Sequence, residues 1–196
     1  MLFDVTGSLP RNAVVTAAKL SIFVSNVRPD RPSLSLESPV TVHELLAPWG
    51  SAGSDAVQQE GAGTRAMAGD ATWTDRFLGG ESWLTPGGDF ELNPAALAIL
   101  GEASLFYELA SDAMVDDVNH WLSSPESNHG WILVGDESTH STARRLNSAN
   151  NPFAATRPTL TLEFHTAPLP EPRTVLLLAV SVGIHLIRRR KPDSRT

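Results

Sequence analysis

The stretch K19-L-S-I-F-V24 carries the clearest fold signal in the chain. Leu20, Ile22 and Val24 occupy alternate positions, and side chains at alternate positions of a strand point to the same face. Residues 160–164 repeat the pattern, with three apolar residues separated by a threonine and a glutamate. Both stretches therefore predict half-buried β-strands.

Three further stretches extend this β-rich body. Val40 and Val42 begin another alternating strand, and short apolar runs at residues 105–107 and 131–134 are bounded by turn-forming residues. Runs of this kind are typical of buried strands. We therefore expect a mostly β fold, an antiparallel β-sandwich or jelly roll.

Residues 111–124 have the period of a helix instead. Ser111 can cap its start and Pro125 marks its end. We expect one short helix that plugs an end of the sandwich. Its apolar face consists of Met114, Val115, Val118, Trp121 and Leu122.

Residues 47–92 have a different composition from the rest of the body. They are rich in Gly, Ala, Ser, Asp and Pro, which is typical of a linker, but a plain linker would lack aromatic residues. We expect a long ordered insertion wrapped over the sandwich and held by its aromatic side chains. These are Trp49, Trp73, Phe77, Trp83 and Phe90.

Charge is unevenly distributed along the 196 residues, whose net charge is −7. Residues 1–165 hold nine basic and twenty acidic residues, whereas residues 166–196 carry a net charge of +4. An acidic body argues against nucleic acid as a partner, because phosphate binding needs clustered Lys and Arg. The chain has no cysteine, which excludes disulfides, thiolate metal sites and a cysteine nucleophile.

The C-terminal region predicts a membrane segment. Thr174 to Ile187 are fourteen residues without a formal charge, and a basic cluster follows them. As a helix they would reach about 21 Å, short of a bilayer core of about 30 Å, a gap that bilayer thinning and snorkelling by Arg188 to Lys191 could close. We expect a transmembrane helix with its basic cluster over residues 174–191 and a cytoplasmic tail at 192–196, with the body outside. A terminal amphipathic or buried helix is the alternative, which the lack of a polar stripe disfavours.

The same region resembles a PEP-CTERM sorting signal. Residues 166–173 form a Pro-rich spacer that contains the PEP motif, and an apolar segment and an arginine cluster follow it. The resemblance implies an exosortase as partner, which would process the tail outside the cell. It also implies an exported protein of bacteria that make extracellular polysaccharide. The residues that match the signal are Pro170, Glu171, Pro172, Arg188, Arg189 and Arg190.

Five collinear stretches of the body together resemble a DNRLRE-domain protein. They are FDVTGSLPRNAVVTAAKLSIFV, TVHELLAPWG, GDATWTDRFLGGESWLTPGGDF, VDDVNHWLSSPESNHGWILVGDEST and TARRLNSANNPFAATRPTLTLEF. The resemblance implies a sandwich of the carbohydrate-binding-module kind, some members of which bind polysaccharides such as alginate. Residues 148–150 read Ser-Ala-Asn where many relatives have Ser-Arg-Glu, so no role of that charge pair is carried over.

Relatives also carry earlier strands and a signal peptide before the segment that opens this chain. We therefore expect in-frame codons upstream of Met1 that encode about two strands and an export signal.

Three tryptophans of the insertion are the candidate sugar contacts. Trp49, Trp73 and Trp83 could stack on the apolar face of a pyranose, or they could fasten the insertion to the body. Trp121 and Trp131 are expected in the core, because one lies on the apolar helix face and the other in an apolar strand.

The sequence assigns no catalytic residue and no metal ligand. Asp112, Asp116, Asp117 and Asn119 offer oxygen atoms that suit Ca²⁺, but their spacing is not that of an EF-hand loop, and Asp112 suits a helix N-terminus. No nucleophile-elbow or zincin motif occurs, and the histidines at 120, 129 and 140 lack metal-ligand spacing. Arg144 and Arg145 should face opposite sides of a strand, so that one pairs inside and the other meets solvent or an anionic ligand; of these roles, a structural salt bridge is favoured.

The resulting interpretation is an exported cell-surface or matrix protein with a structural or polysaccharide-binding sandwich and no cofactor. The alternative is a polysaccharide lyase or hydrolase on the same fold, because fold alone does not separate the two. A membrane-anchored adhesin that is never processed differs only in the fate of the tail.

Overall fold

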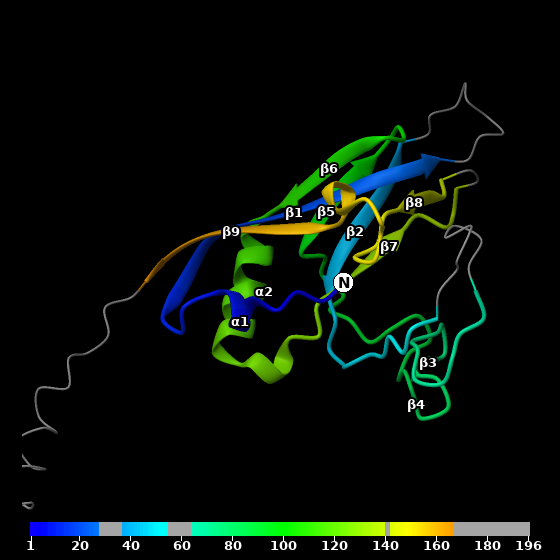
Figure 1. Ribbon diagram of the computed structural model, residues 1–196, viewed down its shortest axis with the longest axis horizontal. Coiled ribbons are helices and arrows are strands. Elements are labelled where there is room, and N and C mark those ends of the chain that lie inside the picture. Colours follow the sequence, from blue (N-terminus) through cyan, green and yellow to red (C-terminus); the bar gives the residue numbers. More distant parts are fainter. Residues whose placement is uncertain (28–36, 55–63, 140–141, 167–196) are drawn as a thin grey trace, which may run out of the picture. The chain divides into compact units, whose positions relative to one another are not determined.

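Strand β1, Ala13–Val27, is the central strand of the larger sheet (Figure 1). Three strands pair with it, all antiparallel: β6, Leu105–Ala110, on one side, and β9, Thr159–Thr166, and β8, Arg144–Leu146, one after the other on the opposite side. Leu20 is opposite Leu109 in β6 and Leu160 in β9. The computed structural model describes residues 1–27, 37–54, 64–139 and 142–166, all within one unit, Met1–Thr166.

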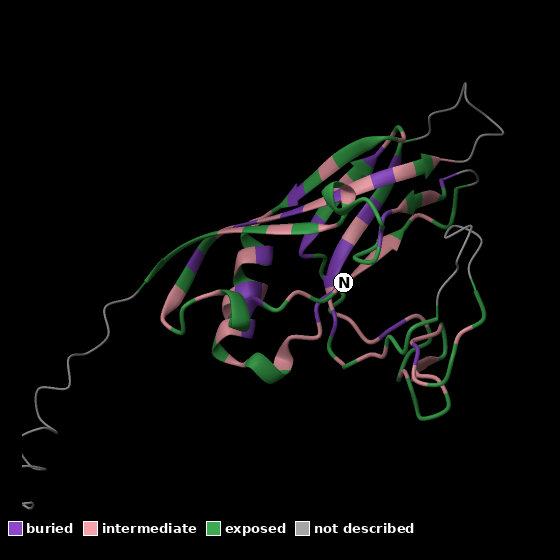
Figure 2. Cartoon of the chain, viewed as in Figure 1, coloured by how far each residue is buried: buried purple, intermediate pink, exposed green. Residues whose placement is uncertain are grey.

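The second sheet has β2, Ser38–Glu44, between β5, Ala96–Leu100, and β7, Trp131–Gly135. Both pairings are antiparallel. The inward side chains of the two sheets share one core, which Figure 2 shows as alternating buried positions along β1 and β2. Val24 and Val42 within it are fully buried.

Helix α2, Asp112–Ser123, contributes Met114, Val118 and Trp121 to the same core. The Ser111 hydroxyl accepts a hydrogen bond from the Met114 amide, so the predicted cap is confirmed, and the helix ends two residues before Pro125. The shorter helix α1, Val5–Ser8, was not predicted. It is capped by Asp4, whose carboxylate accepts from the Gly7 amide.

Helix α2 lies beside the part of β1 that extends beyond β6. The register of β1 against β9 shifts between Val15 and Ala17, and β6 does not extend far enough to cover this part of β1. The Asn119 side chain on α2 accepts from the Val15 amide at 2.9 Å and donates to the Val15 carbonyl at 3.0 Å. The helix therefore satisfies main-chain groups that no strand reaches.

The insertion leaves the second sheet at the end of β2 and returns at the start of β5. It contains a small hairpin, β3, Asp75–Phe77, and β4, Glu81–Ser82. At its base the Leu46 amide donates to the Asp89 carbonyl and the Glu91 amide to the Glu44 carbonyl, both at 2.9 Å. The described parts, residues 47–54 and 64–92, are thus tied to the body and to each other by hydrogen bonds.

The mostly β fold with antiparallel sheets and one principal helix is confirmed. Two short 3₁₀ turns, Pro125–Ser127 and Ala154–Thr156, complete the described elements. The predicted sorting signal, membrane helix and tail, from residue 167 onward, lie outside the described residues. Within the described ranges, no helix combines the length and the apolar character that crossing a membrane requires.

Candidate functional site

A cavity of about 310 Å³ lies between the insertion and strand β7. Its lining is largely apolar and aromatic, with one threonine, and it includes two of the three candidate tryptophans. The lining residues are Met1, Leu45, Trp49, Ala71, Thr72, Trp83, Gly87, Trp131, Ile132 and Leu133.

Trp49 and Trp83 hold this cavity in shape through their indole nitrogens. The Trp49 Nε1 donates to the His129 carbonyl at 2.9 Å, which ties the insertion to the segment before β7. The Trp83 Nε1 donates to the Thr72 carbonyl at 3.0 Å, inside the hairpin region. Both rings are half-buried, so each one both fastens the insertion and presents part of its surface to the cavity.

Trp73 is placed differently, because 67% of it is exposed. Its ring lies against Gly87, and a Cβ added to Gly87 would come within 2.8 Å of the Trp73 Cη2. Gly87 has a φ of 99° and donates its amide to the Trp73 carbonyl at 2.7 Å. Glycine is therefore required here on two grounds, the left-handed backbone and the close approach of the ring.

Since Gly87 also lines the cavity, the exposed ring of Trp73 adjoins it. We call this arrangement the insertion site: the Trp73 ring on Gly87, with the cavity walled by Trp49, Thr72 and Trp83. The three candidate tryptophans are thus brought into one region. Two of them fasten the insertion, and one presents an open aromatic face.

Asp75 gives the insertion site an acidic, hydroxyl-rich neighbourhood. Its carboxylate accepts hydrogen bonds from the hydroxyls of Thr74 at 2.8 Å, Ser82 at 3.0 Å and Thr72 at 3.2 Å. These bonds, the one from Thr74 first, hold the pKa of Asp75 below its ordinary value. The carboxylate is consequently ionised at neutral pH.

Asp70 closes the base of the loop that precedes the hairpin. This buried carboxylate accepts from the amides of Ala52 at 2.6 Å and Met67 at 2.7 Å, which belong to the two described ends of that loop. The Met67 amide is the main cause that lowers the pKa of Asp70, followed by the Ser54 side chain. The sequence offers no local signal for this role, because the partners on one side lie far along the chain.

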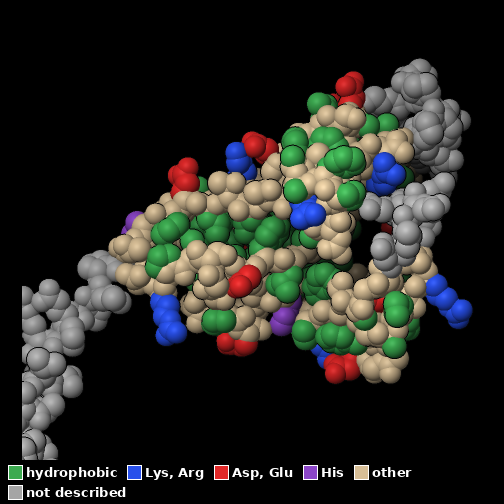
Figure 3. All heavy atoms as spheres, in the orientation of Figure 1, with side chains coloured by type: hydrophobic (Ala, Val, Ile, Leu, Met, Phe, Trp, Pro, Cys, Tyr) green, Lys and Arg blue, Asp and Glu red, His purple; other side chains and the backbone are tan. Residues whose placement is uncertain are grey.

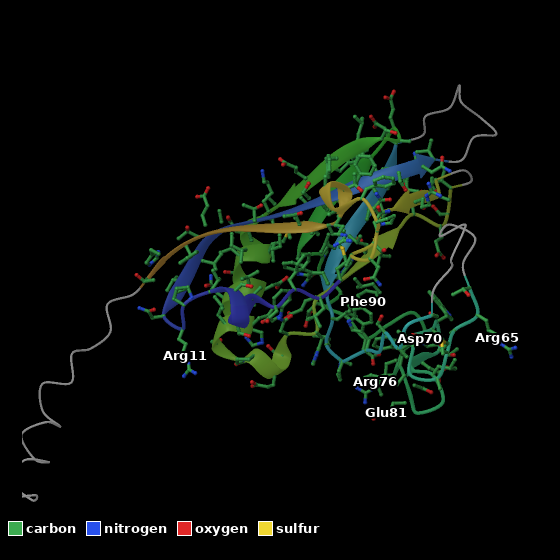
Figure 4. The ribbon with its side chains drawn as sticks, viewed as in Figure 1. Arg11, Arg65, Asp70, Arg76, Glu81 and Phe90 are labelled. Atoms are coloured by element: carbon green, nitrogen blue, oxygen red, sulfur yellow. The ribbon has the colours of Figure 1, made fainter. Side chains whose placement is uncertain are left out.

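His43 and Phe90 mark the junction between insertion and sheet, as Figure 4 illustrates for Phe90. Their rings are 5.0 Å apart, and the His43 Nδ1 donates to the Glu91 carbonyl at 2.7 Å. Sequence reasoning missed His43, which is buried on the outward side of β2 because the insertion covers it.

A second cluster of titratable groups lies where α2 meets the second sheet. Trp121 and Trp131 are fully buried, as predicted, with ring centroids 4.6 Å apart. The Trp121 Nε1 donates to Glu44 and the Trp131 Nε1 to Asp117, both at 2.7 Å. Burial, with a smaller contribution from the nearby Glu44 charge, raises the pKa of Asp117 to about 6. Neither carboxylate belongs to the lining of the cavity at the insertion site.

The four residues considered as Ca²⁺ ligands do not form one site, because their side chains have different partners or are exposed. Asn119 binds the β1 bulge, Asp117 binds Trp131, and Asp112 and Asp116 are exposed on the helix. Among the residues that the structure describes, no group of three or more acidic or histidine side chains is arranged to hold a metal ion.

The remaining histidine and arginine candidates do not meet at the insertion site. Burial lowers the pKa of His129, His120 lies exposed near the end of α2, and His140 is outside the described residues. The Arg144 Nε donates to the Gly101 carbonyl at 3.0 Å, and the Arg145 Nε donates to the Ser25 hydroxyl at 2.9 Å.

A second cavity, of about 470 Å³, opens between the ends of the two sheets. Asp136, Glu137 and Arg144 are its charged lining residues. Hydrogen bonds from Ser138 and Thr139 lower the pKa of Asp136 to about 2, so this carboxylate is a poor candidate for a general acid.

The comparisons add no relative to this description. No family model, no curated protein and no solved structure matches the chain.

Proposed function

We propose that the chain is an exported surface or matrix protein whose two-sheet body, a sandwich or jelly roll in fold class, binds polysaccharide at the insertion site. The observation that carries this proposal is the open face of Trp73, held on Gly87 at the rim of a cavity walled by two more tryptophans. An exposed, rigid aromatic face suits the apolar C–H face of a sugar ring.

The delivery part of the proposal rests on the C-terminal sequence. The Pro-Glu-Pro motif, the apolar segment and the arginine cluster suit recognition by an exosortase and an outward-facing body. Mutating Glu171 to Ala should block processing and leave the mature protein larger on a denaturing gel. An unchanged mobility would refute the sorting step and favour an adhesin that keeps its anchor.

The enzymatic alternative gains less support from the geometry. Among the described residues, the carboxyl whose pKa is raised, Asp117, belongs to the core cluster under α2 and is absent from the lining of both cavities described above. A glycoside hydrolase needs its acid and its second carboxylate beside the scissile bond. We therefore propose binding without cleavage.

The test is a glycan-binding screen of the full chain, with product release measured in the same wells and with calcium or EDTA present. Saturable binding without product is the expected result. Product release would replace the proposal with the enzymatic alternative, and no binding to any glycan would overturn it.

Two glycine variants connect binding to the insertion site. Gly87→Ala should displace the Trp73 ring, because the new Cβ cannot lie 2.8 Å from Cη2. Gly79→Ala is the matched control: its φ is also positive, at 81°, but no atom lies within 4 Å of an added Cβ. We expect Gly87→Ala to lose glycan binding and Gly79→Ala to retain it. If the two variants lost glycan binding to the same extent, the position of the Trp73 ring would not determine binding.

A further inference from the structure

The charges of the insertion bear on the kind of sugar that the proposed site accepts. Residues 64–92 carry two arginines and five acidic residues, a net charge of −3. A sugar that carries a carboxylate, such as a uronate, needs a cation to offset the cost of desolvating its charge. The two arginines are the basic side chains that this part of the insertion offers.

Neither arginine belongs to the lining of the cavity beside Trp73. Arg76 is engaged by Glu81 across the β3–β4 hairpin, where Figure 4 shows the two side chains together. Arg65 is exposed and points outward at the edge of the insertion in the same view. Figure 3 likewise shows basic side chains that lie singly on the visible face, with hydrophobic side chains at the surface of the insertion.

The polar groups closest in sequence to Trp73 are acidic or hydroxyl groups, which favour sugar hydroxyls and disfavour an anionic sugar. Asp75 is ionised, and three hydroxyls surround its oxygens. An ionised carboxylate and hydroxyls can exchange hydrogen bonds with sugar hydroxyls, but the carboxylate repels a second negative charge. Asp89 adds another carboxylate, which accepts from the amides of Leu84 and Thr85 in the segment after the hairpin.

The lining of the cavity also favours an uncharged ligand. Its lining contains no charged side chain, and Thr72 supplies its hydroxyl. The amino group of Met1, another lining residue, donates to the Trp131 carbonyl, and burial lowers the pKa of this amine to about 6, so it is mostly uncharged at neutral pH. A pocket with apolar walls and few polar groups favours an uncharged ring with one apolar face.

We propose that the insertion site selects uncharged pyranosides over uronates. This inference rests on the proposed polysaccharide binding and adds the class of sugar. Stacking on Trp73 provides the attraction, and the acidic surroundings provide the discrimination against anionic chains.

The experiment measures binding of the full chain, kept soluble in mild detergent, by titration calorimetry. The neutral probes are mixed-linkage β-glucan and galactomannan, and the anionic probes are alginate and polygalacturonate. Each is titrated at low and at high salt. We expect at least one neutral probe to bind about tenfold or more tighter than either anionic probe at low salt, with a smaller difference at high salt because salt screens the repulsion.

Three variants assign the effect to residues. Trp73→Ala should weaken binding of the neutral probe by about tenfold, the scale of one lost aromatic contact. Leu84→Ala, a change at a 93% exposed residue of the same region, should leave binding unchanged. Glu81→Gln should strengthen binding of the anionic probes and leave the neutral ones unaffected, since it frees Arg76 from its partner.

The outcomes separate this inference from the function on which it rests. Tighter, salt-sensitive binding of alginate or polygalacturonate would overturn the neutral preference and keep polysaccharide binding. Neutral binding that survives Trp73→Ala would overturn the assignment to the insertion site. No binding of any probe would overturn the proposed function itself.

Discussion

Replacing Asp117 by Asn should stabilise the protein, and more so at alkaline than at acidic pH. Burial raises the pKa of Asp117 from 3.8 to about 6, so the folded protein favours the protonated acid. The favourable contribution of this group is complete below pH 3.8 and is lost as the pH rises through 6. The asparagine is neutral throughout, and its carbonyl can still accept from the Trp131 Nε1.

The size of the effect follows from the shift. A shift of about two units corresponds to ~3 kcal/mol without screening. Asp117 is only partly buried, so solvent reduces this to about 1–1.5 kcal/mol at pH 8. For a chain of this size that is a rise in Tm of about 2–6 °C.

The assay is thermal unfolding at pH 4, 6 and 8, followed by circular dichroism. The matched control is Asp116→Asn, which removes the same charge from the exposed neighbour on α2. Wild type and Asp117→Asn should have nearly equal Tm at pH 4 and diverge at pH 8. A gain in Tm that does not change with pH, or an equal gain in the control, would refute the reasoning about burial.

Three further substitutions test the supporting structure. Asn119→Ala should lower the free energy of unfolding by roughly 2–4 kcal/mol, because it removes both hydrogen bonds to Val15 at the bulge; a loss below about 1 kcal/mol in urea unfolding would contradict this. Ser111→Ala removes the cap from the Met114 amide and should cost about 0.5–2 kcal/mol by the same measurement, whereas an unchanged unfolding midpoint would contradict the cap. Asp70→Ala should make the insertion a faster target for limited proteolysis while the core of the two sheets resists; an unchanged cleavage pattern would show that the carboxylate does not hold the loop.

The elements that could be predicted are those whose signal lies entirely within their own stretch of sequence. β1 alternates because one of its faces is buried, and α2 has its cap, its apolar stripe and its terminating proline within one segment. β5 could not be recognised in the same way. Its sequence ALAIL is apolar on both faces, although Leu97 is 61% exposed and Ile99 46%, so no alternation marks it as a strand.

The candidate site could be predicted only in part. Tryptophans in a loop-rich segment can be recognised as candidates for sugar contact or for fastening the insertion. Whether each ring is exposed depends on partners far along the chain. Trp49 is fastened by a carbonyl eighty residues away, whereas the Trp73 ring lies against Gly87 and 67% of the residue is exposed. The roles of Asp70 and His43 depend on similar contacts, which no local pattern encodes.

The pairing of β1 also sets the order in which a newly made chain can fold. Ala13 lies opposite Thr166, and Lys19 lies opposite both Ala110 and Thr161, so every strand that completes the larger sheet is synthesised long after β1. Such distant contacts form late, because the chain must first lose the entropy of closing long loops. The larger sheet of a nascent chain therefore stays incomplete until β9 has been made. For the export proposed above, late completion of this sheet would be useful, since a chain that has not yet folded can still pass through a narrow translocation pore.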